Sequence, residues 1–146
     1  MPRSGDPYGG YNYLVDLGTG LSEGPSAAFR EVSGLGASIE VVEYRVGNDP
    51  EPQARKLPGL RKFSNVTLKR GLTDSSELWD WLNSDPPDRR NVLITLLDGQ
   101  RNEVIRFLLH NAWPCRWTGP QLDAGSSAVV IESLELCHER LDLAAS

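Results

Sequence analysis

The sequence contains no run of apolar residues long enough for a membrane-spanning helix, which needs about 20 of them. The segment from Met1 to Pro7 also lacks the apolar core of a secretory signal peptide. We therefore predict a protein that has no membrane segment and that folds in the cytosol.

Cysteine and histidine are scarce, with two residues of each type. In a reducing compartment, two cysteines that stand far apart in sequence, such as Cys115 and Cys137, are more often free thiols than a disulfide. Cys137 and His138 are neighbours, so on a strand they would point to opposite faces and could not share a metal ion. Acidic neighbours at Glu135 and Glu139 disfavour the thiolate that a nucleophile needs. The sequence therefore predicts structural thiols and no metal site.

Positive charge is in deficit, because 15 lysines and arginines face 20 aspartates and glutamates, for a net charge of −5 and a pI near 5.0. A net negative charge repels nucleic-acid phosphates, so stable nucleic-acid binding is not expected. The glycines of Gly34-Leu35-Gly36 lack the third glycine and the lysine of a phosphate-binding loop. No pair of carboxylates stands in a context that predicts acid–base catalysis. We expect no catalytic, cofactor-binding or metal-binding residues, and therefore no enzyme.

The length of 146 residues predicts a single domain over residues 1–146, with a flexible glycine-rich lead at 1–10. Strand-like patterns dominate the chain, and a mainly β fold with one helix follows from them. The expected strands lie at 11–17, 28–32, 38–44, 63–70, 91–97, 103–109, 112–118 and 128–139.

The last of these strands changes phase, because its apolar residues stand at Val129 and Ile131 and then at Leu134 and Leu136. Side chains alternate between the faces of a strand with a period of two. A bulge or a second buried surface is therefore predicted there.

One helix is expected near residues 75–83. Asp74, with Glu77 three residues later, has the form of a capping box at its start, and Asp85-Pro86-Pro87 would stop it. Its apolar face should consist of Leu78, Trp81 and Leu82.

In a long segment from Arg45 to about Arg61, the apolar residues follow neither the period of a helix nor that of a strand, and prolines and glycines interrupt it. The sequence therefore predicts a loop there. Loops longer than about 12 to 15 residues are uncommon in compact domains and usually have a function. Contact with a neighbouring subunit would be such a function.

Several segments, in this order, resemble the phage tail tube family, which includes the inner tubes of contractile injection particles. They are Phe29-Arg30-Glu31-Val32-Ser33-Gly34-Leu35, Lys56-Leu57-Pro58-Gly59-Leu60, Asn65-Val66-Thr67-Leu68-Lys69-Arg70-Gly71, Leu78-Trp79-Asp80-Trp81, Asn111-Ala112-Trp113-Pro114 and Ile131-Glu132-Ser133-Leu134-Glu135-Leu136-Cys137-His138-Glu139.

The resemblance implies two antiparallel sheets packed as a β-sandwich or rolled barrel, with the helix on the flank. It also implies that neighbouring subunits join into a ring-shaped barrel of six, and that rings stack into a hollow tube inside a sheath. Sheath contraction would propel the tube and convey protein or DNA cargo. The implied partners are other copies of the chain, the sheath protein, and baseplate or tube-initiator proteins. Assembly would be cytoplasmic, and the product a phage tail or a phage tail-like particle.

On this resemblance the long loop would contact a neighbouring subunit or ring. The candidate interface residues are Arg45, Asn48, Asp49, Pro50, Lys56, Leu57, Pro58, Gly59 and Leu60. The polar face of strand 63–70 would line the lumen, with Asn65, Thr67 and Lys69 as the candidates.

Two alternatives stay open at this stage. The first is a β-sandwich binding module in which Trp113 and Trp117 form a ligand platform, whereas Trp81 would belong to the core. The second is a tube-initiator protein of the same fold at the baseplate. The sequence also leaves open whether the tube belongs to a phage or to an injection particle.

Overall fold

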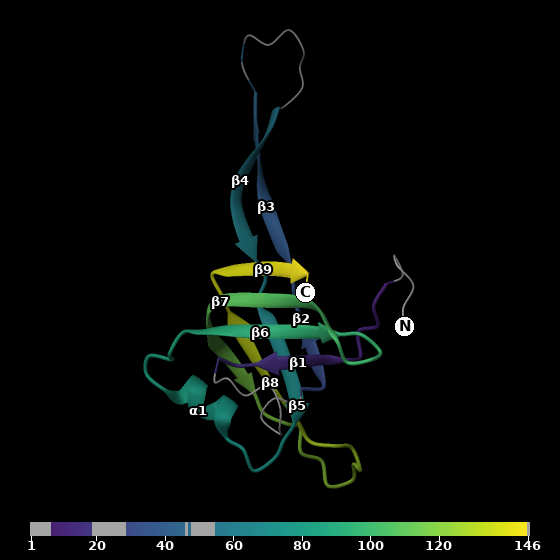
Figure 1. Ribbon diagram of the computed structural model, residues 1–146. Helices are drawn as coiled ribbons and strands as arrows, with labels where there is room; N and C mark the ends of the chain where they lie inside the picture. The colour runs from purple at the N-terminus through teal and green to yellow at the C-terminus, as the bar shows by residue number, and fades with distance from the viewer. Residues whose placement is uncertain (1–6, 19–28, 46, 48–54, 146) are drawn as a thin grey trace.

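The computed structural model describes residues 7–18, 29–45, 47 and 55–145 (Figure 1). No helix in this part of the chain is long and apolar enough to cross a membrane. The elements are β1 Tyr13–Asp16, β2 Glu31–Ser33, β3 Ala37–Tyr44, β4 Arg55–Phe63, β5 Val66–Gly71, α1 Glu77–Asn83, β6 Arg90–Leu97, β7 Glu103–Thr118, β8 Ile131–Cys137 and β9 Arg140–Ala145.

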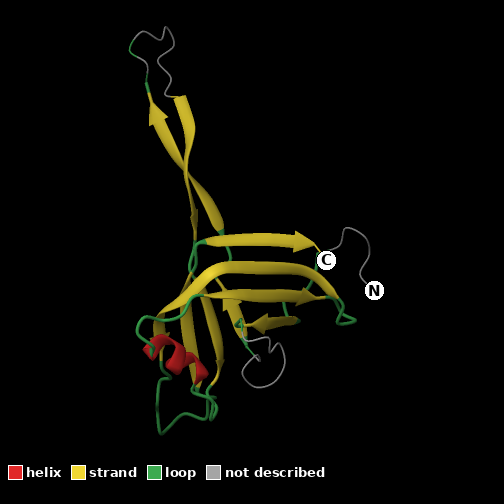
Figure 2. Cartoon of the chain, turned by 60° about the vertical axis from the view of Figure 1, so that its left-hand side comes forward, coloured by secondary structure: helices red, strands yellow, loops and turns green. Residues whose placement is uncertain are grey.

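Strand β7 determines the architecture, because it belongs to two layers. Its first half pairs with β6 and β9, and its second half pairs with β8, which continues through β5 to β2. Asn111, with φ of 53°, lies between the two halves. Figures 1 and 2 show β1, β6, β7 and β9 running across a second layer of steeper strands. All pairings are antiparallel, so the predicted mainly β fold of two packed sheets is confirmed.

The core lies between the two layers and is closed on one flank by α1. Its fully buried members come from both layers and from the helix: Val15, Val92, Ile94, Leu109, Val66, Leu68, Leu134, Leu136, Leu78 and Trp81. Burial of Leu78 and Trp81 confirms the predicted apolar helix face, and Leu82 is half-buried beside them. On β5, Val66 and Leu68 are fully buried whereas Lys69 is exposed. One face of this strand therefore lies toward solvent, as the alternation of apolar and polar residues predicted.

A buried ion pair accounts for the phase change near the C-terminus. Arg70 and Glu132 lie directly opposite each other on β5 and β8, and the Arg70 Nε donates to Glu132 Oε1 at 2.7 Å. Their exposed fractions are 1% and 2%. Glu132 therefore occupies the inward position before Leu134 and Leu136, and the β5–β8 register runs without a shift. Of the two predicted alternatives, a bulge is absent from the β5–β8 pairing, and the phase changes because the paired carboxylate of Glu132 occupies the inward position.

The bounds of several strands differ from the prediction. The expected strands 103–109 and 112–118 form one continuous strand, because β7 bends without breaking. The expected strand 128–139 is shorter, and a further strand, β9, follows it and pairs with the first half of β7. The strand expected at 28–32 begins at Glu31, and residue 28 lies outside the described residues.

The helix begins two residues later than predicted. Ser76 is its N-cap, without a side-chain cap hydrogen bond, so the proposed capping box of Asp74 and Glu77 is wrong. Glu77 Oε2 instead lies 3.8 Å from Arg70 Nη1, and this ion pair turns the carboxylate toward the protein interior. The helix ends at Asn83, before Pro86 and Pro87, as predicted.

Removing one member of the buried pair should destabilise the domain strongly. Glu132→Gln removes the nearer of the two carboxylates that neutralise the buried Arg70 and leaves only Glu77 at 3.8 Å, and breaking a buried ion pair typically costs roughly 3–5 kcal/mol. The apolar double variant Arg70→Met/Glu132→Leu should recover at least half of that loss, because it removes both buried charges. Urea unfolding measures both effects.

The matched control is Arg89→Gln, which breaks the exposed pair with Glu139. An exposed pair contributes roughly 0–1 kcal/mol, so the free energy of unfolding should hardly change. If Glu132→Gln were as mild as Arg89→Gln, the role given to the buried pair would be wrong.

Candidate assembly surfaces

An isolated two-stranded ribbon, made of β3 and β4, projects from one end of the body (Figures 1 and 2). We call it the arm, and its described residues are 37–45, 47 and 55–63. Every residue of β3 and all but Gly59 and Phe63 of β4 are exposed. The arm pairs with no other strand in the described part of the chain. A two-stranded ribbon alone in water is marginally stable, so this one needs support from outside the monomer.

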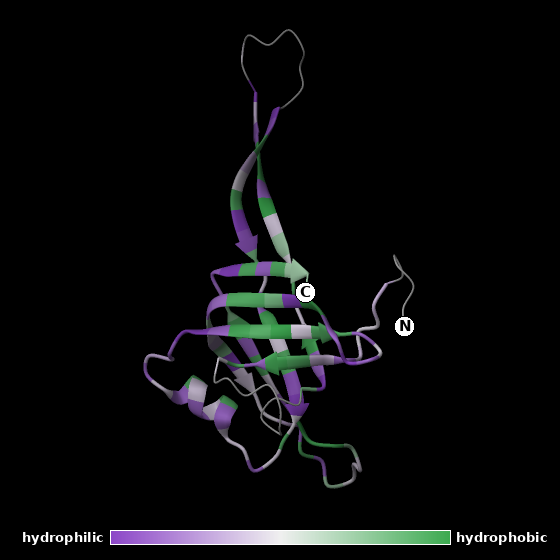
Figure 3. Cartoon of the chain, viewed as in Figure 1, coloured by the Kyte–Doolittle hydropathy of each residue, from purple (hydrophilic) through white to green (hydrophobic). Residues whose placement is uncertain are grey.

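Apolar and polar residues alternate along both strands of the arm, as the colours of Figure 3 show, and the register places apolar residues on both of its faces. Val42 pairs with Leu57, and with Leu60, which is 70% exposed, they lie on one face. Val41 pairs with Pro58 on the other face, which also carries Ile39. Because neither face is covered, one flat contact would leave half of this apolar surface in water.

The arm also carries an uneven charge. Strand β4 contains four basic residues and no acidic one: Arg55, Lys56, Arg61 and Lys62. Strand β3 contributes Glu40 and Glu43, and Glu40 lies 3.9 Å from Lys62 in an exposed pair. The β4 strand is therefore a basic edge next to apolar side chains.

The arm corrects the prediction of a loop from Arg45 to about Arg61. Residues from Arg55 onward form strand β4, although it contains Pro58 and Gly59. Each strand of a two-stranded ribbon has an open edge, where proline is tolerated. The register shifts between Ile39 and Val41, and a Cβ on Gly59 would lie 3.0 Å from Glu40 O, so glycine allows this close approach.

The candidate interface residues divide into two groups. Those that the structure describes lie on the arm: Arg45, Lys56, Leu57, Pro58, Gly59 and Leu60. Asn48, Asp49 and Pro50 lie outside the described residues.

The candidate lumen residues stand on one face of the second layer. Thr67 and Lys69 alternate with buried residues of β5, and Lys69 Nζ lies 3.2 Å from Glu31 on β2. Asn65, just before β5, donates to Glu135 Oε2 at 2.9 Å. The structure thus brings the three candidates to one polar face.

The same face carries both cysteines, which are free thiols as predicted. Cys115 lies at a bulge of β7, where its Sγ is 3.5 Å from Glu135 Oε2. Partial burial raises the pKa of the Cys115 thiol to about 12, and hydrogen bonds with Cys137 and Glu135 act in the same direction. The hydrogen bond from Asn65, followed by that from Cys115, lowers the pKa of Glu135. Such a thiol is a poor nucleophile at neutral pH.

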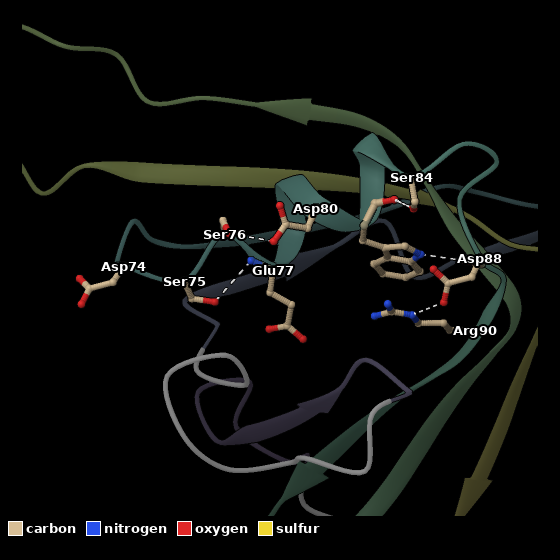
Figure 4. Close-up of a pocket in the computed structure, with 9 residues that line it drawn as sticks. Asp74, Ser75, Ser76, Glu77, Asp80, Ser84, Asp88 and Arg90 are labelled. Atoms are coloured by element: carbon tan, nitrogen blue, oxygen red, sulfur yellow. Dashed lines mark hydrogen bonds and ion pairs between the residues drawn. The ribbon is translucent and has the colours of Figure 1, made fainter.

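A hollow of about 660 Å³ beside α1 is lined mainly by polar residues (Figure 4). Two of its carboxylates accept hydrogen bonds from neighbouring residues: Ser76 donates to Asp80, and Arg90 donates to Asp88. The hydrogen bond from Arg90 lowers the pKa of Asp88, so that carboxylate is not poised as a general acid. Within the described residues, no group of three or more histidine, cysteine or acidic side chains could hold a metal ion.

The segment after β5 and the segment before β8 lie at the end of the body opposite the arm (Figure 1), and both carry exposed apolar residues that the sequence did not indicate as a surface. We call this end the base surface, and define it as Leu72, Asp74, Leu122, Asp123 and Val129. The backbone N–H of Leu72 donates to Val130 O at 2.9 Å, which joins the segment after β5 to the one before β8. Leu122 and Val129 are 80% and 71% exposed. The sequence gave little signal for this surface, because Leu72 and Leu122 stand in segments without a strand or helix pattern and Val129 was assigned to the expected strand 128–139.

The tryptophans do not form an open platform. Trp113 and Trp117 are half-buried, Trp117 Nε1 donates to Glu132 Oε2, and the Trp117 ring packs edge-on against Trp79 at 5.1 Å. Trp81 is buried in the core, as expected. The rings of Trp113 and Trp117 serve packing in this structure.

Comparison with protein families matches residues 10–142 to the model described as T4-like virus tail tube protein gp19. Comparison with curated proteins found no match.

Solved structures give long and close matches. A chain of the PVC extracellular contractile injection system, in a sheath–tube complex in the extended state, is 27% identical with a TM-score of 0.83, over 96% of this chain and 93% of that one. A chain of the anti-feeding prophage baseplate, six-fold symmetrised, is 29% identical with a TM-score of 0.81, over 95% and 96%. A chain of the PVC sheath/tube terminator is 28% identical with a TM-score of 0.84, over 98% and 100%.

The environment of Cys115 predicts slow alkylation in the native protein. At pH 8, iodoacetamide should modify Cys115 at least about tenfold more slowly in the folded than in the urea-unfolded chain, because the thiolate is rare when the pKa is raised. Mass spectrometry of the peptide measures both rates. Equal rates would contradict the raised pKa.

Proposed function

This chain belongs to the T4-like virus tail tube protein family, and we propose from that premise that it is the tube subunit of a contractile injection particle. The chain would form rings, and the rings would stack into a hollow tube inside a sheath. The observation that carries the proposal is the arm, which is apolar on both faces and uncovered in a chain that otherwise has a complete core.

The family match and the solved structures support the choice of system. The similar chains come from a sheath–tube complex and a sheath/tube terminator of an extracellular contractile injection system, and from the baseplate of the anti-feeding prophage. By analogy, the partners of this chain would be the sheath and the baseplate, and the product would be a phage tail-like particle outside or attached to the cell. Assembly would precede release, in the cytoplasm.

Ring formation has a physical basis in the open strand edges. In the described part of the chain, β1, β2 and β9 each pair with a single strand. Such edges are available to a neighbouring copy, and closure of this pairing around an axis would leave no edge unpaired. We propose six subunits in a ring, supported by the six-fold symmetry named for the similar baseplate structure.

The arm is proposed to reach between neighbouring copies. Its two apolar faces would then both be covered, which a single neighbour cannot achieve. The candidate interface residues on the arm would contribute here, with Leu57 and Leu60 as the apolar contacts and Lys56 as a charged one.

The polar face with Asn65, Thr67 and Lys69 is proposed to line the lumen. Its local pairs, such as Lys69 with Glu31, neutralise part of its charge. A channel wall of this kind, in a chain with net charge −5, would let a protein or a polyanion pass without binding it tightly. In this function the tube is passive and no residue is catalytic.

The binding-module alternative has less support. It needs Trp113 and Trp117 as a ligand platform, but both are half-buried and Trp117 is hydrogen-bonded to Glu132. A tube initiator at the baseplate remains a variant of the same proposal.

Arm substitutions should abolish assembly without unfolding the body. Leu57→Asp/Leu60→Asp places charges on an apolar contact that the monomer does not use, so the free energy of unfolding should change by less than about 0.5 kcal/mol per site. Negative-stain electron microscopy should show rings and tubes for the parent protein and none for the variant. Tyr11→Asp, at another exposed ring, is the control and should assemble normally. Normal tubes from the arm variant would refute the role of the arm.

Labelling tests the lumen assignment. In a Cys115→Ser/Cys137→Ser background, Lys69→Cys in assembled tubes should react with a small maleimide but not with a large polyethylene-glycol maleimide, because only the small reagent can enter the channel. The same variant as an unassembled monomer should react with both. Equal reaction of tubes with both reagents would place Lys69 on the outside.

A further inference from the structure

Cys115 and Cys137 lie on neighbouring strands and on the same face. In the β7–β8 register, Cys137 stands opposite Trp113, and Cys115 follows Trp113 two residues later on the same strand. Side chains two residues apart on a strand share a face, so both thiols point to the polar face of the second layer. The row between them, Pro114 opposite Leu136, is buried on the other face, toward the core.

The bulge in β7 brings the Cys115 thiol close to β8. The register shifts between Pro114 and Arg116, so Cys115 is an extra residue that has no partner in the ladder. Its Sγ donates to Glu135 O at 3.5 Å, and the thiol is also hydrogen-bonded to Cys137. The two thiols are therefore in contact across the strand pair. A disulfide needs Cα atoms roughly 4.4–6.8 Å apart, and an unpaired bulge residue is the part of a strand that can shift most easily to that distance.

Small reagents can reach this pair of thiols. Cys115 is exposed and Cys137 is half-buried. The nearest polar groups to the Cys115 Sγ are Asn65 Nδ2 at 3.8 Å and Glu135 Oε2 at 3.5 Å. Neither group forms a covalent bond with a thiol. The reaction that two thiols in contact can share is oxidation to a disulfide.

We propose that Cys115 and Cys137 form a redox modification site, at which a low-molecular-weight disulfide of the glutathione class converts the two thiols into one intrachain disulfide. The bond ties the bulge of β7 to the end of β8 and closes the connection 119–130 into a loop. This chemistry is a property of the single chain. Only its timing rests on the proposed function, in which the chain assembles in a reducing cytoplasm and then leaves it for an oxidising medium.

The reaction is a thiol–disulfide exchange in two steps. Partial burial raises the pKa of the Cys115 thiol to about 12, so the first attack falls to Cys137. The Cys137 thiolate attacks one sulfur of the glutathione disulfide, the S–S bond of that disulfide breaks, and one glutathione thiolate leaves. Cys137 then carries glutathione and no charge, which removes one of the causes that raise the pKa of Cys115.

In the second step, Cys115 loses its proton to water and attacks the Cys137 Sγ, and the second glutathione thiolate leaves. The two cysteines have then lost two protons and two electrons. The electrons have reduced one glutathione disulfide to two thiolates, which take up the two protons from water.

Oxidised glutathione, added at pH 8 to the dilute, unassembled protein, tests the site. Intact-mass spectrometry after acid quenching should show chains that have lost two hydrogens, and a non-reducing digest should join the peptides of Cys115 and Cys137. Cys115→Ser should stop with one glutathione on Cys137, because no second thiol is present to release it. Cys137→Ser should take up glutathione at least about tenfold more slowly than Cys115→Ser, since Cys115 is rarely ionised.

The matched control is Cys137→Ser/Lys69→Cys, which keeps two thiols on the polar face. Strand β8 lies between β5 and β7, so the two thiols are separated by two strand spacings, about 9–10 Å, which a disulfide cannot span. This variant should carry glutathione adducts and form no intrachain disulfide.

Urea unfolding measures what the bond does to the body. A disulfide that closes a loop of about 20 residues restricts the unfolded chain, so the oxidised parent protein should unfold at a urea midpoint about 1–2 M above that of the reduced protein. Dithiothreitol should reverse the shift.

The outcomes separate this inference from the tube function. A parent protein that stays reduced, stops at a glutathione adduct or forms disulfides only between chains would overturn the site. Equal rates for the two single variants would overturn the order of attack, and an unchanged or lower urea midpoint would show that the bond does not brace the body. None of these measurements requires rings, so loss of the disulfide leaves the tube function standing, and failure to assemble leaves the redox site standing.

Discussion

The buried pair of Arg70 and Glu132 is the interaction on which the second layer of the fold depends. It joins β5 to β8 near one end of their pairing, and two further contacts extend it: Trp117 of β7 donates to Glu132, and Glu77 of α1 approaches Arg70. Four elements thus converge on two charges that water cannot reach. A buried charge is tolerated only with its partner in place, so these elements must assemble together.

The same pair fixes the end of the molecule that carries the base surface, because Arg70 immediately precedes Gly71 and Leu72. The opposite end is built on another principle. The arm has no core of its own, and its side chains face water on both sides of a two-stranded ribbon. The molecule therefore combines a body that has its own buried core with a two-stranded arm, and such a ribbon is only marginally stable alone in water.

The sequence predicted those elements whose pattern is local. The alternation of apolar and polar residues along 63–70 predicted a strand with one solvent-exposed face. The i, i+3 spacing of Leu78 and Trp81, followed by prolines, predicted a short helix. The sequence failed where a long-range contact overrides a local pattern. Glu77 does not form the predicted capping box, because its carboxylate pairs with Arg70. Strand β4 was not predicted, because it contains a proline and a glycine, which the open edge of a ribbon tolerates.

The sequence by itself determined the mainly β class, the lack of a recognisable catalytic constellation and the ordered motifs of a tail tube family. It also identified arm residues such as Leu57 and Leu60 as interface candidates, although it described them as part of a loop. Only the tertiary structure decided that Glu132 points inward, that Asn65, Thr67 and Lys69 share a face with Glu135, and that the apolar surfaces of arm and base lie at opposite ends. These facts depend on partners far apart along the chain, such as Arg70 and Glu132, which are separated by 62 residues. A local pattern carries no information about which distant residue will stand opposite.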